Sequence, residues 1–275
     1  MVETPDSHKV ALTARPVRSA YRNFATIRTI LALILREMST RYGRTPGGYL
    51  WTVLEPLAAV LFLSLGFSLI FASPPLGTSF FLFYATGYMP FELYITLSRA
   101  CRHAIDFSRP LLRYPAVTWV DAILARFFLN GLTGAFNTVL LMTGIMLLDR
   151  TQATAYPPLI GIAILLSLLL GLGIGAINQV ITAFFPIWDI IWSVINRPLF
   201  IASGTFFLYD DMPELAQDVL WYNPLIHIVG LMRKGFYPTY SADYASITYV
   251  LLVSMTLITF GFLMLNRYNR EIVNR

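Results

Sequence analysis

Of the charged residues within long apolar runs of the sequence, Glu55, Arg126 and Arg197 are the three that are not set aside as near a span end. An ionised side chain near the centre of a bilayer costs about 2.5–3.5 kcal/mol even on lenient insertion scales, so such residues usually have a charged partner or line a polar route. Arg197 follows Asp189 by eight residues, which is about 12 Å along a helix. We expect the three residues at similar depth, where they either pair with one another or line a path for a polar substrate.

Residues suited to acid–base catalysis are sparse. A membrane-embedded glycan or acyl transferase would need a histidine or paired carboxylates, but His103 and His227 are expected on opposite sides of the membrane, and no two carboxylates recur on one helical face. The three histidines lack metal-ligand spacing, and Cys101 is the single cysteine, so we expect no disulfide framework. We therefore expect no catalytic, metal or cofactor-binding residue, and keep a transferase as an alternative.

The chain also lacks the G-x-x-x-x-G-K-[ST] loop that binds nucleotide phosphates. Its one glycine cluster, at residues 171–176, formally fits G-x-G-x-x-A but lies inside an apolar run with no strand before it. Small-residue helix packing, including the pair Gly171 and Gly175, is the better interpretation. Any ATP hydrolysis must then take place in another chain.

The elements that position these residues are membrane-spanning helices. Hydrophobic residues make up 56% of the chain and charged residues 13%, and mean hydropathy is +0.63. A hydrocarbon core about 30 Å thick needs roughly 20 apolar residues per spanning helix. Six runs qualify, at about 50–71, 80–97, 119–148, 159–185, 190–209 and 247–265. We predict an all-α integral membrane protein with six transmembrane helices. It shows no internal repeat of the secondary-transporter kind.

The segments outside these runs predict further organisation. Residues 1–24 are polar and are expected to form a flexible cytosolic tail, and the absence of an apolar core before about residue 27 argues against a secretory signal. Residues 25–49 predict an amphipathic interface helix and an entrance segment, ahead of a single transmembrane domain over 50–275. Between spans five and six, 213–221 and 223–236 predict two short helices split at Asn223-Pro224, forming an extracytoplasmic re-entrant hairpin.

Arginine and lysine placement predicts the orientation. Fifteen basic residues fall on the side of the termini and three on the opposite side. Both termini are therefore expected in the cytosol. The net charge of +5 follows from this asymmetry, so nucleic acid is not an expected partner.

Several motifs occur in a fixed order along the chain. Arg41-Tyr42-Gly43-Arg44, Gly48, Leu50-Trp51 and Glu55-Pro56 stand where the amphipathic segment meets the first span, and downstream come Arg197-Pro198, Ser203-Gly204-Thr205-Phe206-Phe207 and Asn223-Pro224-Leu225-Ile226-His227. In these motifs and in the six-span plan, nearly the whole chain resembles permease subunits of ABC exporters that move polysaccharides, most closely the capsular-polysaccharide group.

The resemblance implies a homodimeric, multi-pass permease of the bacterial inner membrane that secretes a lipid-linked polysaccharide. Two cytosolic ATP-binding subunits would use ATP and Mg²⁺, and periplasmic and outer-membrane export partners would extend the route. O-antigen or teichoic-acid export is the nearest alternative. The entrance motif favours capsule export, as does the short cytosolic tail, which leaves no room for a carbohydrate-recognition domain.

Two groups of residues are expected at the cytosolic side. Entrance arginines either anchor to anionic lipid, at about 1 kcal/mol each, or also hold the phosphate or acidic sugars of a glycolipid. The loop at 99–118 either only follows the positive-inside rule or, by resemblance, contains a coupling helix that docks into the ATPase. The entrance group is Arg36, Arg41, Arg44, Trp51 and Glu55, and the coupling group is Arg102, His103, Arg109 and Arg113.

Two more groups are expected further along the route. Tyrosines, with an apolar ring and a polar hydroxyl, suit a sliding sugar chain that needs many weak contacts, although aromatic belts are also ordinary at membrane interfaces. The expected translocation path comprises Tyr84, Tyr88, Tyr94, Arg126 and Arg197, and the expected exit hairpin contains Trp221, Asn223, Pro224 and His227.

Overall fold

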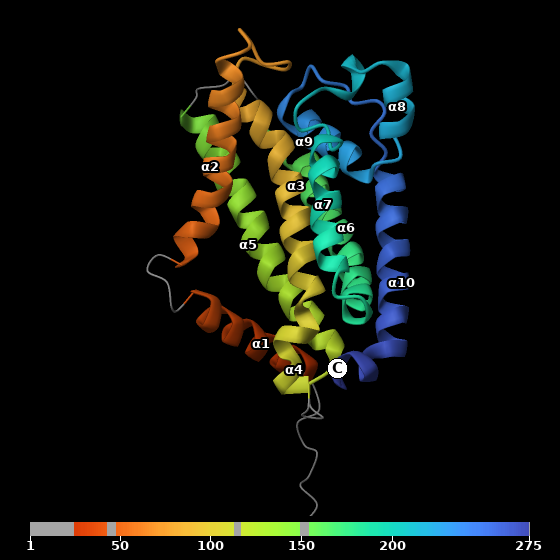
Figure 1. The fold of residues 1–275 in the computed structure, drawn as a ribbon. Helices are drawn as coiled ribbons and strands as arrows, with labels where there is room; N and C mark the ends of the chain where they lie inside the picture. The colour runs from red at the N-terminus through yellow and green to blue at the C-terminus, as the bar shows by residue number, and fades with distance from the viewer. Residues whose placement is uncertain (1–24, 43–47, 113–116, 149–153, 275) are drawn as a thin grey trace, which may run out of the picture.

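The computed structural model describes residues 25–42, 48–112, 117–148 and 154–274. Arg44 and Arg113, the side chain of Arg41 and the predicted tail at 1–24 lie outside the described residues, so their predicted roles are not addressed. Within the described ranges the chain is helical, and its long helices run side by side in one bundle (Figure 1). The prediction of an all-α fold is confirmed.

Four helices among the described residues are long and apolar enough to cross a membrane. They are α2 (Gly48–Ser68), α5 (Trp119–Leu148), α6 (Pro157–Phe184) and α10 (Ile247–Asn274). They correspond to the first, third, fourth and sixth predicted spans. Much of the surface of α2 and α10 is exposed and apolar, with Phe62, Leu69 and Leu263 among the exposed side chains, as expected for helices that face lipid.

Helix α10 runs nine residues past its predicted end at 265. The other two predicted spans also differ from their expected bounds. Helix α3 (Phe80–Arg102) continues five residues past the predicted end at 97, so Glu92 lies well inside it. Helix α7 (Trp188–Ile201) has 14 residues and stops eight residues before the predicted end at 209. The chain leaves the helix at residues 202–208, where Gly204 takes a positive φ of 83°, a conformation that glycine adopts at little cost.

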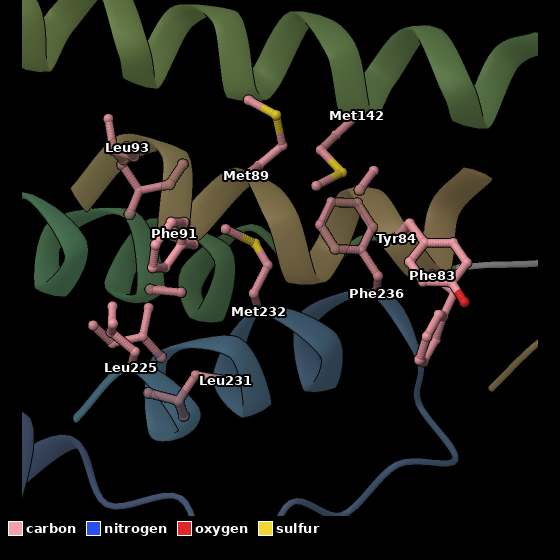
Figure 2. Packing of buried hydrophobic residues seen from close by; sticks show 14 of the residues in the cluster. Phe83, Tyr84, Met89, Phe91, Leu93, Met142, Leu225, Leu231, Met232 and Phe236 are labelled. Carbon is pink, nitrogen blue, oxygen red and sulfur yellow. The ribbon is translucent and has the colours of Figure 1, made fainter. Parts of the chain in front are cut away.

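Helix α3 lies at the centre of the bundle, and its sides pack against α2, α5, α6 and α9. It buries a dense aromatic and aliphatic core with α5 and α9, part of which Figure 2 shows: Phe83, Tyr84, Met89, Phe91, Met142, Met232 and Phe236. Ser79 is the N-cap residue of α3, and its Oγ accepts a hydrogen bond from the Leu82 N–H at 3.2 Å. The middle of the bundle is therefore built on α3.

The predicted small-residue packing of the glycine cluster is confirmed. A Cβ on Gly171 would lie 3.0 Å from the Tyr94 carbonyl oxygen, and one on Gly175 would lie 2.8 Å from the Ser98 carbonyl oxygen, both on α3. Gly173 faces the other way, where a Cβ would lie 2.8 Å from Cβ of Leu257 on α10. Helix α6 thus approaches both neighbours closely, without side chains between the backbones.

Short elements cover the two ends of the bundle (Figure 1). At one end, α1 (Ala25–Tyr42) packs on α5 beside α4 (Ala104–Leu112). At the other lie the 3-10 turn η1 (Tyr209–Asp211), α8 (Glu214–Leu220) and α9 (Pro224–Phe236). Helix α1 lies within the segment predicted at 25–49, and α8 and α9 lie on either side of the predicted break at Asn223-Pro224. We call these ends the α4 end and the α9 end.

Candidate functional site

A polar stripe runs along α3. Tyr88, Glu92, Thr96, Arg99 and His103 follow one another at intervals of three or four residues, which places them on one face of a helix. The Tyr88 hydroxyl donates to Glu92 Oε2 at 3.1 Å, and the Thr96 hydroxyl donates to Glu92 Oε1 at 2.7 Å. The Glu92 carboxylate is therefore held in one orientation inside the bundle.

A cavity of about 430 Å³ opens on one side of this stripe, between α1, α2, α3 and α5. We call it the α5-side cavity. Its charged and amide lining consists of Glu37, Glu55, Glu92, Arg99, Arg126, Asn130 and Asn137. The Asn137 amide donates to the Thr52 carbonyl oxygen at 2.8 Å, joining α5 to α2. The space is polar enough to take a hydroxyl-bearing ligand.

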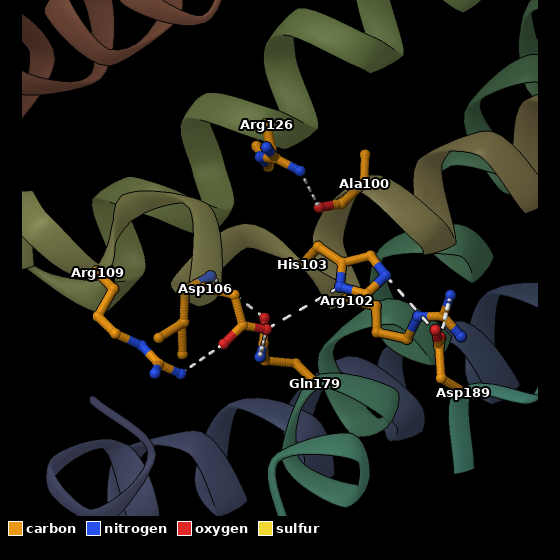
Figure 3. Close-up of polar contacts among 9 residues, drawn as sticks. Ala100, Arg102, His103, Asp106, Arg109, Arg126, Gln179 and Asp189 are labelled. Carbon is orange, nitrogen blue, oxygen red and sulfur yellow. Dashed lines mark hydrogen bonds and ion pairs between the residues drawn. The ribbon is translucent and has the colours of Figure 1, made fainter. Parts of the chain in front are cut away.

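Arg126 is fixed in this cavity by contacts from three directions. Its Nε lies 3.3 Å from Glu37 Oε2 of α1, its Nη1 donates to the Ala100 carbonyl oxygen at 3.1 Å, and its guanidinium lies 4.4 Å from the Phe107 ring centroid; Figure 3 shows the Ala100 contact. Of the expected charges, Glu55 and Arg126 line the same cavity, but the carboxylate that pairs with Arg126 is Glu37.

A second cavity of about 310 Å³ lies on the other side of the stripe, between α3 and α7. We call it the α7-side cavity. Its α7 lining includes Trp192, Ser193, Asn196, Arg197 and Phe200, and its α3 lining includes Tyr88, Phe91, Glu92, Arg99 and Arg102. Glu92 and Arg99 line both cavities. Arg197 therefore lies apart from Arg126, on the opposite side of α3.

The tyrosines predicted for the path divide between two environments. Tyr88 lines the α7-side cavity. Tyr84 and Tyr94 have relative exposures of 2% and 1% and pack in the hydrophobic core, where Figure 2 shows Tyr84 beside Phe83. They line neither of the two cavities.

At the α4 end, charged residues connect three helices (Figure 3). Arg102, at the end of α3, forms an ion pair with Asp189 in the first turn of α7. His103 Nε2 lies 3.9 Å from the same carboxylate, and Arg109 pairs with Asp106 at 2.8 Å within α4. Burial lowers the pKa of His103, and the neighbouring Arg102 lowers it further, whereas Asp189 and Asp106 raise it. Arg102 is thus buried inside the chain, whereas Arg109 is partly exposed.

The entrance residues within the described part lie around α1 and α2. Arg36 places its guanidinium 5.1 Å from the centroid of the Phe107 ring, which Arg126 also contacts. Trp51 and Glu55 are exposed on α2. Phe107 of α4 thereby connects α1 with α5.

The residues of the predicted exit hairpin form one connected cluster at the α9 end. Asn223 caps α9 by accepting from the Leu225 N–H at 3.1 Å and donates to the Ala202 carbonyl oxygen at 2.9 Å, with Pro224 in the first turn of the helix. His227 is buried, its Nε2 lying 2.7 Å from the Trp221 carbonyl oxygen, and its Nδ1 accepts from the Ser246 N–H at 3.2 Å. These contacts join α8, α9 and the start of α10.

Sequence reasoning missed an arginine at this end. Arg233 of α9 has a relative exposure of 1%. It donates to the carbonyl oxygens of Phe207 at 2.7 Å and Thr205 at 3.1 Å, and it lies 4.3 Å from the centroid of the Phe83 ring. It thus supplies donors to the non-helical segment after α7, where backbone groups have no helical partner. In the sequence, Arg233 lies in the predicted short helix at 223–236 on the outer side, and nothing in that position indicates this role.

Sequence reasoning also passed over Glu37, Glu92 and Arg99, which line the cavities. The apolar run that predicts the second span stops at 97, which places Glu92 near a span end. The spacing of Tyr88, Glu92 and Thr96, four residues apart, was the signal that could have revealed the stripe. Within the described residues, no group of three or more His, Cys, Asp or Glu side chains is placed to hold a metal ion.

Apolar helices that surround a polar stripe and two cavities define a class of protein: a multi-pass membrane protein with a place for a polar substrate inside the bundle. The chain belongs to the ABC-2 type transporter family, whose sequence model matches residues 28–237. It is 30% identical to the polysialic acid transport protein KpsM of Escherichia coli over 234 residues, which cover 85% of this chain and 90% of the relative.

Two further relatives match this chain over a similar share of its length. The capsule polysaccharide export inner-membrane protein BexB of Haemophilus influenzae is 26% identical over 89% of this chain and 92% of the relative. The protein of the same description from Neisseria meningitidis, CtrC, is 25% identical over the same shares. The similarity therefore extends over both cavities and both ends of the bundle.

Proposed function

We propose that this chain is the permease subunit of an ATP-driven exporter that secretes a lipid-linked capsular polysaccharide across the bacterial inner membrane. The observation that carries the proposal is the stripe from Tyr88 to His103, which presents a fixed carboxylate, a hydroxyl and a guanidinium to cavities on both sides of α3. The names of the relatives favour capsule export over O-antigen or teichoic-acid export.

The proposed membrane arrangement uses α3 as one further crossing, and the 14-residue α7 together with the non-helical segment at 202–208 as the other. With the α4 end in the cytosol, both termini are cytosolic and α8 and α9 form the outer re-entrant hairpin. Helix α1 would lie in the cytosolic interface, where its exposed Ile27, Leu31 and Leu35 reach the acyl chains. These three residues recur every four positions, as an interfacial apolar face requires.

A second copy of this chain completes the proposed permease. Helix α2, with exposed Phe62 and Leu65, lines the cavity on one side of the α3 stripe, and helix α7, with exposed Ile190 and Val194, lines the cavity on the other. A second copy against these exposed residues would enclose the stripe and shield it from lipid. The sugar chain would then pass between two copies of α3, in contact with Tyr88, Glu92 and Arg99.

Two ATP-binding subunits would supply the energy from ATP and Mg²⁺, since the chain has no phosphate-binding loop of its own. We place their contact on α4, where Asp106 is exposed and Arg109 is partly exposed at this end of the bundle. The Arg102–Asp189 pair would carry a displacement of α4 to α7. Export would continue through periplasmic and outer-membrane partners.

The test compares Glu92→Gln with Glu271→Gln in the permease reconstituted with its ATP-binding partner. Glu271 is an exposed carboxylate on α10, outside both cavities. We expect Glu92→Gln to lose glycolipid-stimulated ATP hydrolysis and transport, and Glu271→Gln to retain both. Equal activity of the two variants would refute the path along α3. Glycan-modifying activity of the purified single chain would instead support a transferase.

A further inference from the structure

The two cavities differ in the balance of their charges. The α5-side cavity has three carboxylates, from Glu37, Glu55 and Glu92, and two guanidiniums, one of which pairs with Glu37. The α7-side cavity has one carboxylate, Glu92, and three guanidiniums. Both oxygens of Glu92 already accept hydrogen bonds from Tyr88 and Thr96. The α7-side cavity is therefore the more positive of the two.

Two of its three arginines remain available to a ligand. Arg102 is paired with Asp189. Arg99 and Arg197 are exposed, and neither has an ion pair or a side-chain hydrogen bond among the contacts of the described residues. Arg99 belongs to α3 and Arg197 to α7, so the two residues line the cavity from opposite walls. Such a pair suits an anion held from two sides.

Two residues of the cavity lining each have a covered polar atom that has no partner among the described residues. Trp192 Nε1 and Asn196 Oδ1 are both without a hydrogen bond, although the Asn196 amide nitrogen donates to the Trp192 carbonyl oxygen at 2.7 Å. A buried polar group left unsatisfied costs about 1–3 kcal/mol. A bound sugar would satisfy both once these two side chains turn toward the cavity, because a ring or hydroxyl oxygen accepts from the indole N–H and a hydroxyl donates to the amide oxygen.

The indole is also held in place for stacking. Trp188 lies against Trp192 with ring centroids 5.9 Å apart and an interplanar angle of 27°, and Trp188 Nε1 donates to Asn178 Oδ1 at 2.8 Å. Phe91 and Phe200 line the same cavity, with their ring centroids 4.9 Å apart. Aromatic faces with a few convergent polar groups are the usual make-up of a small-ligand site.

We propose that the α7-side cavity is an anion-selective sugar subsite, in which Arg99 and Arg197 bind a phosphate or carboxylate of the glycan and Trp192 and Asn196 bind the adjoining sugar. Its volume of about 310 Å³ lies at the lower end of the range for small-ligand sites, so it takes one charged sugar unit at a time. The proposal rests on the glycan-export function and specifies which chemical group of the substrate is recognised, and where.

The test measures equilibrium binding to the permease–ATPase complex in nanodiscs of zwitterionic lipid. Three radiolabelled probes are used: an oligosaccharide of carboxylate-bearing sugars, a neutral oligosaccharide of equal length, and a neutral monosaccharide linked to lipid through phosphate. Arg99→Gln and Arg197→Gln are compared with Arg270→Gln, which removes an exposed arginine of α10 outside both cavities. Arg197→Lys retains the charge without the planar guanidinium.

We expect each glutamine variant to weaken binding of at least one anionic probe roughly tenfold, the size of effect for losing one charge-assisted hydrogen bond. The neutral probe should bind equally to both variants and to wild type, and Arg197→Lys should fall between Arg197→Gln and wild type. Loss confined to the carboxylate probe identifies an acidic sugar as the ligand, and loss confined to the phosphate probe identifies the lipid link. Trp192→Phe should weaken all three probes, because the sugar loses one donor.

Three results would overturn the subsite. The first is unchanged affinity for every probe in both glutamine variants, and the second is an equal loss for neutral and anionic probes in those variants. The third is full displacement of the anionic probes by phosphatidylglycerol, which would show that the site binds lipid headgroups. Failure of the function itself looks different, because wild-type complex would then bind none of the three glycan probes.

Discussion

Arg126 of α5 forms an ion pair with Glu37 of α1, with Nε 3.3 Å from Oε2 and with the two side chains only 12% and 5% exposed. The pair joins α1, at the α4 end of the bundle, to α5 beside the α5-side cavity. Phe107 of α4 contacts the same guanidinium. Because both charges are largely removed from water, each contributes to the compensation of the other.

Replacing one partner of this pair should therefore destabilise the protein more than replacing both. Removing a single partner of a buried pair costs about 3–5 kcal/mol, since the remaining charge stays buried without the opposite charge of the pair. We expect Arg126→Met to lower the thermal unfolding midpoint in detergent, and the double variant Glu37→Gln/Arg126→Met to recover most of the loss. A double-mutant cycle measures the coupling. Recovery with Glu55→Gln in place of Glu37→Gln would contradict the pairing.

Loss of Arg233 should open the segment at 202–208. In Arg233→Met, the carbonyl oxygens of Thr205 and Phe207 lose their donors, and each unsatisfied acceptor costs about 1–3 kcal/mol. The reporter is a cysteine at position 203, introduced as Ser203→Cys after Cys101 has been replaced by alanine. Because Ser203 is fully buried, this cysteine should react slowly with an impermeant maleimide. We expect Arg233→Met to raise its labelling rate roughly tenfold or more, since the rate of local opening follows that free energy.

Two controls accompany that measurement. Leu215→Cys on α8 replaces a residue that is 83% exposed and should be labelled equally with and without the Arg233→Met change. Arg233→Lys retains one charged donor and should give an intermediate rate. If Ser203→Cys were labelled equally slowly whether Arg233 is present or replaced by methionine, Arg233 would not be what closes this segment.

Close packing of α6 on α3 should make Gly175 intolerant of a side chain. The Cβ in Gly175→Ala would lie 2.6 Å from Cβ of Cys101 and 2.8 Å from the Ser98 carbonyl oxygen, so the helices must separate, at a cost of about 1–3 kcal/mol. Gly161→Ala, in the same helix with nothing within 4 Å, should gain about 0.5–1 kcal/mol. Thermal unfolding of the two variants checks the contrast, and equal midpoints would contradict it.

Acidification should loosen the α9 end through His227. Burial lowers the pKa of His227, and its Nδ1 must stay unprotonated to accept from Ser246. The folded pKa lies below the unfolded value of about 6.5, so the unfolded state binds more protons as pH falls through this range. Stability is therefore retained above about pH 6.5 and declines below it.

The measurement is the unfolding midpoint between about pH 7.5 and about pH 5. His227→Gln offers an amide with one acceptor and one donor and does not titrate, so its midpoint should fall less than that of wild type. His103→Gln serves as the comparison, since His103 also has a lowered pKa but is exposed to a greater degree. An unchanged slope in His227→Gln would show that this histidine does not control the pH response.

Features set by local composition could be predicted from the sequence. Long apolar runs located α2, α5, α6 and α10, because the bilayer criterion depends only on length and hydropathy. The break at Asn223-Pro224 located the start of α9, since asparagine caps a helix and proline fits its first turn. The end of α7 could not be predicted, because the segment after it depends on Arg233 from a different helix.

The sequence by itself determined the class of protein, its apolar helices and the charges that had to be accommodated among them. Only the tertiary structure decided which charges meet: Glu37 reaches Arg126, Arg102 reaches Asp189, and Glu92 stands between two cavities. Hydropathy is a property of consecutive residues, so a window of the sequence is enough to calculate it. An ion pair depends on a distance of a few ångströms between helices far apart in sequence, which packing alone sets.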